Sequence, residues 1–143
     1  MLGQMTALMD QEFFVFRVHA CSDIYITLSK IPQYTQNDAY QIILGAEQNQ
    51  RSKINKMAPF SETKDFSTPG LLDCATLKNF WVSWTAGHFY VGEGETVNEN
   101  ELFNWRDVNN PYPINALSLG SRGDEVTRWE FLRSAGEWLA EPL

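Results

Sequence analysis

Residues 78–92 read KNFWVSWTAGHFYVG and carry the clearest structural signal of the sequence. Aromatic and β-branched residues fill two arms, and the short break Thr85-Ala86-Gly87 separates them. Two alternating runs joined by a short turn that contains glycine are typical of a β-hairpin. Because successive side chains of a strand point to opposite faces, alternate residues of both arms can face one core. The residues predicted to do so are Phe80, Val82, Trp84, Phe89 and Val91.

Short apolar runs separated by turn signals continue on both sides of this hairpin. We expect residues 71–75 to begin a strand that continues into the first arm, so that 71–85 act as one element, whereas the prolines and glycine of 58–70 predict a loop. About nine or ten short strands without a strongly amphipathic helix predict an all-β fold, an antiparallel β-sandwich that is jelly-roll-like. The other predicted strands are 12–20, 24–29, 39–45, 51–57, 88–92, 102–105, 114–119 and 126–132.

The 143 residues are enough for one domain with a two-layer core. We predict that residues 12–133 form this domain and that residues 134–143 form a C-terminal tail. Residues 1–11 are predicted as an N-terminal arm, in which the apolar residues have the spacing of a short helix.

The composition excludes some classes of partner. The net charge is −7, and the sequence has no run of Lys or Arg, so we expect no nucleic-acid binding. Since no apolar stretch approaches the roughly 18 residues of a membrane span, we expect no membrane insertion. The first ten residues lack the features of a signal peptide. Cys21 and Cys74 either form one disulfide or remain two buried thiols, and both possibilities stay open.

Four blocks of sequence, in order, carry a family resemblance. They are FRVHACSD (16–23) with ITLS (26–29), YQIILG (40–45) with Asn49, Arg51-Ser52 and Ile54, FWVSW (80–84) with Gly87-His88 and Val91-Gly92, and TRWEF (127–131). Over residues 13–131 the chain resembles the domain named for farnesoic acid O-methyltransferase, found in many invertebrate proteins. It departs from the family at residues 46–48, where a turn with Gly and Trp is expected. The name implies methyl transfer, and the family's association with secreted, lectin-like proteins implies an extracellular location and binding.

The residues themselves favour binding over catalysis. An adenosyl cofactor is usually held by a glycine-rich βα turn, but Gly92-Glu93-Gly94 is followed by an acidic, polar stretch. His19 and His88 are the only histidines, and neither belongs to a catalytic motif. The ligand spacing of a zinc site is also missing.

Carbohydrate binding needs an aromatic plane for the C–H face of a sugar and planar polar groups for its hydroxyls. If successive strands alternate in direction, the loops at 21–23, 46–51, 85–88 and 105–113 meet at one end of the sandwich. That end would also collect Asp23 and Glu47, and turn formation or core packing would explain each residue singly. The predicted carbohydrate-binding residues are Gln48, Asn49, Arg51, His88, Trp105, Asp107, Asn109 and Asn110.

The opposite end would gather Glu93, Glu95, Glu99, Asp124 and Glu125. These carboxylates could hold calcium, but a solvated acidic face explains them as well, so we predict no required cofactor. The tripeptide Arg122-Gly123-Asp124 is read by adhesion receptors but is also an ordinary hairpin turn.

We therefore predict a non-catalytic, lectin-like protein whose partners are glycans. Because a single shallow sugar site is weak, we expect homo-oligomers that gain avidity. One alternative is the small-molecule methyltransferase that the family name implies. A further alternative is a protein–protein interaction module, which the five tryptophans would serve.

Overall fold

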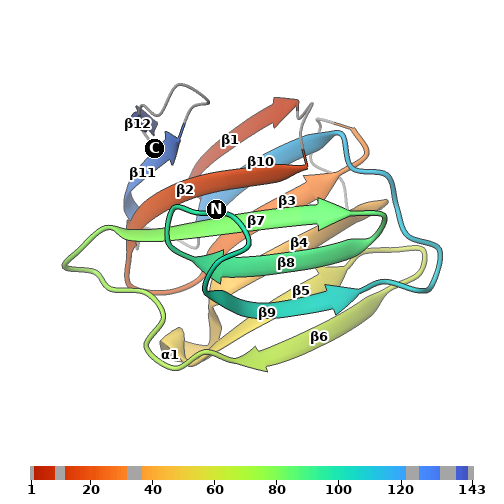
Figure 1. The fold of residues 1–143 in the computed structure, drawn as a ribbon, viewed down its shortest axis with the longest axis horizontal. Coiled ribbons are helices and arrows are strands. Elements are labelled where there is room, and N and C mark those ends of the chain that lie inside the picture. Colours follow the sequence, from red (N-terminus) through yellow and green to blue (C-terminus); the bar gives the residue numbers. More distant parts are fainter. Residues whose placement is uncertain (1, 9–11, 32–36, 122–125, 133–137, 142–143) are drawn as a thin grey trace.

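Two six-stranded antiparallel sheets pack face to face (Figure 1). This computed structural model describes residues 2–8, 12–31, 37–121, 126–132 and 138–141. Sheet A contains, in spatial order, β1 (Leu2–Leu8), β10 (Ala116–Ser121), β3 (Ile24–Ser29), β4 (Ala39–Gly45), β5 (Arg51–Lys56) and β6 (Glu62–Ser67). Sheet B contains β12 (Trp138–Glu141), β11 (Val126–Leu132), β2 (Phe13–Ala20), β7 (Lys78–Thr85), β8 (His88–Glu93) and β9 (Glu101–Arg106). The predicted all-β sandwich is confirmed.

The hairpin of β7 and β8 forms the middle of one core wall, as its sequence predicts. Val82 pairs with Val91 and Trp84 with Phe89, and the side chains on this face are buried. Phe16 of β2 continues the wall, with its ring centroid 5.8 Å from that of Phe80. Alternation of period two therefore places the aromatic residues of sheet B against the aliphatic residues of sheet A. The aliphatic side includes Ile24, Ile26, Leu28, Ile42, Leu44 and Ile54, all with no exposed surface.

Strand β6 lies where the sequence predicts a loop. It pairs with β5 along its whole length, from Glu62 beside Lys56 to Ser67 beside Arg51. It is an edge strand, and two of its three half-buried positions carry the charged residues Glu62 and Lys64. Edge strands are often charged in this way, which prevents pairing with other molecules and removes the apolar alternation that marks a strand.

Three other segments differ from the prediction. Residues 2–8, predicted as an arm with helical spacing, form β1 and pair with β10. Residues 138–141 of the predicted tail form β12 beside β11. Residues 71–77 form no strand; they cross from sheet A to sheet B instead of extending β7. Pairing with a sheet edge is a tertiary contact, so local spacing does not reveal it.

Cys21 and Cys74 form a disulfide, which decides between the two possibilities that the sequence leaves open. The bond joins the turn after β2 to the crossing segment. We call the end of the sandwich that holds this bond, with turns 21–23, 45–51 and 67–78, the disulfide end. The opposite end, with turns 85–88 and 106–116, is the hairpin end.

Candidate functional site

The predicted carbohydrate-binding residues do not converge, and the prediction of one shared site is wrong. Gln48, Asn49 and Arg51 lie at the disulfide end, where Thr68 N donates to Gln50 O at 3.0 Å. The other five lie at the hairpin end: His88, Trp105, Asp107, Asn109 and Asn110. The cause is the unpredicted strand β6, because one extra strand reverses the direction of every strand that follows it. The same reversal brings Glu93 to the disulfide end, whereas Asp124 and Glu125 lie outside the described residues.

At the disulfide end, Asn49 has a structural role. Its amide clamps the backbone of Leu72, donating from Nδ2 to the carbonyl at 2.8 Å and accepting from the N–H at 2.9 Å. Glu47, Gln48 and Asn49 all have positive φ, so α1 (Ala46–Asn49) is a left-handed turn at the position where the sequence departs from the family pattern. This turn directs the Asn49 amide toward the crossing segment and leaves Gln48 exposed.

Arg51 contributes to an exposed charge ladder. Its Nε donates to Asp65 Oδ1 at 2.6 Å on the neighbouring strand and lies 3.8 Å from Glu47. Both partners of the shorter pair are more than a third exposed. Because its guanidinium is already paired on the outer face of sheet A, Arg51 does not face the other predicted site residues.

At the hairpin end, Asp107 belongs to a buried ionic network. Its Oδ2 lies 2.7 Å from Lys56 Nζ and accepts the Tyr40 hydroxyl at 2.6 Å. Lys56 and Asp107 are 2% and 3% exposed, so both charges have left water. Burial alone would raise the pKa of Asp107, but the hydrogen bonds from Lys56, Tyr40 and the Asn109 backbone lower it. Burial, followed by the bond to Asp107, raises the pKa of Tyr40.

The same network fixes the loop that holds the remaining predicted residues. Lys56 donates to the carbonyl of Asn109, and Asn109 N donates to Asp107 Oδ1 at 2.9 Å. Trp105 packs inward, with its ring stacked 6.2 Å from Phe89. The backbone of Asn109 and the ring of Trp105 thus support the fold, and Asn110 is exposed beside them.

A hollow of about 290 Å³ lies on the outer face of sheet B. One wall is the loop 94–100, which folds back over β7 (Figure 1). This loop covers Trp81, whose Nε1 donates to Glu99 O at 2.7 Å. Gly92 makes the arrangement possible, because a Cβ there would lie 2.2 Å from the Trp81 ring. The hollow is lined by Glu12, Phe13, Ser83, Trp84, Thr85, Tyr90, Val97 and Asn98.

The lining combines aromatic surface with groups that hydrogen-bond to hydroxyls. Phe13 is 42% exposed, and Tyr90 is half-buried. Around them stand the carboxylate of Glu12, the amide of Asn98 and the hydroxyls of Ser83 and Thr85. The sequence pattern predicts the inward residues of this hairpin and not its outer face. The outward set of the same alternation was the signal that could have indicated this face.

His88 is the predicted residue that adjoins this hollow. Its ring stacks on Tyr90 with centroids 4.2 Å apart, and its Nδ1 lies 3.1 Å from the Tyr90 hydroxyl. On the other side, His88 Nε2 lies 3.0 Å from Asn104 Oδ1, and Asn104 Nδ2 donates to Glu101 Oε2 at 2.7 Å. One polar row therefore crosses β8 and β9, formed by Tyr90, His88, Asn104 and Glu101.

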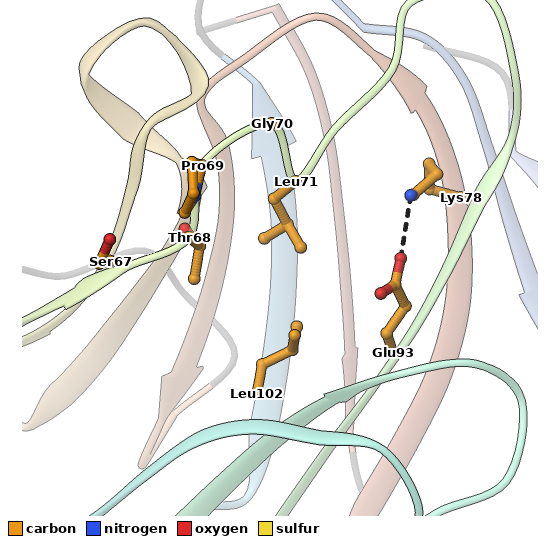
Figure 2. Close-up of a pocket in the computed structure, with 8 residues that line it drawn as sticks. All are labelled: Ser67, Thr68, Pro69, Gly70, Leu71, Lys78, Glu93 and Leu102. Carbon is orange, nitrogen blue, oxygen red and sulfur yellow. Dashed lines mark ion pairs between the residues drawn. The ribbon is translucent and has the colours of Figure 1, made fainter.

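A second hollow, also of about 290 Å³, lies toward the disulfide end (Figure 2). Leu71 and Leu102 face each other across it, and an ion pair of 2.9 Å between Lys78 and Glu93 stands at one side (Figure 2). The described residues that line it include no aromatic side chain, and among them the one cation, Lys78, is paired with the one carboxylate, Glu93. It therefore offers a sugar less than the hollow on sheet B.

Among the residues that the structure describes, no group of three or more His, Cys, Asp or Glu side chains could hold a metal ion. Within the same residues, no helix is long and apolar enough to cross a membrane.

Comparison with solved structures identifies the fold. Galectin-Ib from Xenopus laevis superposes with a TM-score of 0.57 at 13% identity, over 90% of this chain and 99% of that one. A double mutant of congerin II gives 0.57 at 11% identity, over 90% and 98%. A prokaryotic β-1,3-1,4-glucanase (lichenase) from a mouse hindgut metagenome gives 0.56 at 11% identity, over 96% and 69%. At such identities the likeness concerns the fold alone.

Comparison of sequences identifies the family and confirms the resemblance described above. "Uncharacterized protein 5" of Haliotis asinina is 30% identical over 123 residues, which cover 84% of this chain and 67% of that protein. Residues 3–134 match the model of the family described as Farnesoic acid O-methyl transferase. The chain therefore belongs to the farnesoic acid O-methyltransferase family, with a galectin-like β-sandwich fold.

Proposed function

We propose that this protein binds glycans without catalysis and that the hollow beside Tyr90 is the site. The observation that carries the proposal is the convergence of Phe13 and Tyr90 with Glu12, Asn98 and two hydroxyl side chains in one hollow. Ring faces can pack against the C–H face of a sugar, and carboxylate and amide oxygens accept its hydroxyl protons.

The rigidity of the site supports binding. Ser83, Thr85 and Tyr90 belong to the paired hairpin of β7 and β8, whose inner face is buried in the core. The loop wall is held by the bond from Trp81 to Glu99, and Gly94 N donates to Asn79 O at 2.8 Å. A site formed before the ligand arrives loses less conformational entropy on binding.

The fold is compatible with this function. One solved neighbour is named as a β-1,3-1,4-glucanase, so a protein of this architecture acts on a polysaccharide. The family description names a methyltransferase instead. In this chain Gly94 begins the loop 94–100, and β9 follows this loop. Gly92 and Gly94 therefore do not precede a helix that could bind an adenosyl cofactor.

The test is a glycan array probed with labelled protein, in calcium and in a chelator, with Phe13→Ala and Phe60→Ala as matched variants. These two phenylalanines are 42% and 41% exposed, but only Phe13 lines the hollow. We expect Phe13→Ala to lose most binding and Phe60→Ala to keep it. Absence of binding in both buffers, or equal losses in both variants, would contradict the proposal.

A calorimetric measurement addresses the methyltransferase alternative. Saturable binding of S-adenosylmethionine in calorimetry would favour methyl transfer over glycan binding.

We also propose that the protein is extracellular and homo-oligomeric. The disulfide supports the first, because disulfides persist in oxidising compartments. Sedimentation analysis tests the second, and a monomer at all concentrations would contradict it.

A further inference from the structure

The polar row from Glu101 to Tyr90 has a defined direction. An ionised carboxylate can only accept hydrogen bonds, so Asn104 must present its NH₂ group to Glu101, at 2.7 Å. The amide oxygen of Asn104 then faces His88 Nε2, at 3.0 Å, which must carry a proton to donate. A neutral imidazole carries one N–H, so Nδ1 is an acceptor. With this tautomer, Nδ1 accepts a hydrogen bond from the Tyr90 hydroxyl, with the oxygen 3.1 Å away.

This direction determines what Tyr90 can offer a ligand. A phenol can donate one hydrogen bond, and in this arrangement Tyr90 donates it to His88. The lone pairs of the oxygen can then only accept a hydrogen bond. Among the described residues of the lining, the one charged side chain is that of Glu12, whose carboxylate is also an acceptor. The described part of the lining contains no Lys or Arg. Arg106 lies opposite His88 in the register of β8 and β9 and is not part of this lining.

We propose that Glu101 sets the direction of the hydrogen bonds in this polar row and thereby makes the hollow selective for neutral glycans over sulfated or carboxylated ones. The hydroxyl groups of a neutral glycan donate hydrogen bonds to Tyr90 and Glu12. This inference rests on the proposed function and specifies its ligand class. A sulfate or carboxylate brings only acceptors and a negative charge. The hydroxyls of Ser83 and Thr85 and the amide of Asn98 can donate to it, but it would also meet the Glu12 carboxylate and the acceptor oxygen of Tyr90 with no cation in the described lining, and such mismatched charges lower affinity. Asn104 and His88 are positioning residues, and Tyr90 is the contact with the ligand.

The direction can be tested without any glycan. Long-range ¹H–¹⁵N correlation spectra of the free protein at neutral pH report which imidazole nitrogen is protonated, and His19→Gln assigns the two histidines. We expect the Nε2–H tautomer at His88. Glu101→Gln should shift the population toward Nδ1–H, because a glutamine amide no longer fixes the orientation of Asn104. Glu95→Gln is the matched control, because Glu95 is an exposed acid of the loop 94–100 and does not belong to the polar row. An Nδ1–H tautomer in the wild type, or a Glu101→Gln spectrum identical to it, would overturn the proposal.

Selectivity is tested by calorimetry with lactose, cellobiose and laminaribiose, each compared with its sulfated derivative. We expect the bound neutral sugar to have at least a roughly tenfold lower Kd than its derivative, about the effect of one good hydrogen bond. Tyr90→Phe should lose roughly tenfold in affinity, whereas Tyr25→Phe, on a half-buried tyrosine of sheet A, should lose nothing. Tighter binding of the sulfated sugars, or an unchanged Kd in Tyr90→Phe, would overturn the inference. If no sugar binds while the spectra show the Nε2–H tautomer, the proposed function fails although the direction of the chain stands.

Discussion

The two ends of the sandwich are closed by different chemistry. At the hairpin end, the buried pair of Lys56 and Asp107, with Tyr40, holds the loop after β9. At the disulfide end, a covalent bond and the Asn49 clamp hold the crossing segment, and the charges near it are exposed. Four exposed large apolar side chains, those of Phe13, Ile31, Phe60 and Val108, also lie at the hairpin end.

The two ends should therefore be sensitive to different perturbations. A buried charge pair has lost its hydration, so removing one partner strands the other in a low dielectric. A disulfide depends on redox conditions instead, because it acts largely by limiting the unfolded chain. The hairpin end should therefore respond to acid and to single substitutions, and the disulfide end to reductant.

The largest effect is expected from Lys56→Met. The substitution leaves the Asp107 carboxylate buried without its cation, and such losses cost about 3–5 kcal/mol of unfolding free energy. Urea denaturation followed by fluorescence measures the change. A loss below about 1 kcal/mol, the level of an exposed pair, would show that the network is not the main support of this end.

Removing the disulfide should have the next largest effect. In Cys21→Ser/Cys74→Ser the loop closed between cysteines with a sequence separation of 53 opens, and the loss expected from chain entropy is about 2–4 kcal/mol. Thermal unfolding of wild type with and without reductant checks the same quantity. If reductant lowers the Tm of the double variant as much as that of the wild type, the bond is not the cause.

Acid should weaken the hairpin end by a smaller amount. The folded pKa of Asp107 is lowered, so its contribution to stability is complete above the unfolded pKa of about 3.9 and is lost as pH falls through the folded value. Urea midpoints measured from neutral pH into this acid range should fall. Asp107→Asn should remove part of that pH dependence, and an unchanged slope in this variant would contradict the assignment.

The smallest effect is expected from Arg51→Met at the disulfide end. Its partner Asp65 is 43% exposed in its side chain, and exposed pairs contribute at most about 1 kcal/mol. Measured beside Lys56→Met under the same conditions, this variant sharpens the contrast between the ends. A loss as large as that of Lys56→Met would remove the contrast.

The candidate site shows how far local sequence carries the reasoning. His88 is predicted correctly as the first residue of the second hairpin strand, but its partners Tyr90 and Asn104 were not predicted. Asn104 belongs to a strand that pairs with β8, and its neighbour is known only once the register is known. Glu12 and Phe13 reach the hollow because β2 lies beside β7, a contact between residues about 70 positions apart in the chain.

Alternation along single strands was determined by the sequence alone. It was enough to predict the sandwich, the β7–β8 hairpin and the inward residues, because burial of one face requires period two wherever a strand covers a core. The tertiary structure decided which loops share an end. That depends on the number of strand reversals, and β6 is stabilised by pairing with β5 rather than by an apolar pattern of its own. The outer face of the β7–β8 hairpin is a candidate site for the same reason, since its hollow exists only where β2, β7, β8 and the loop 94–100 meet.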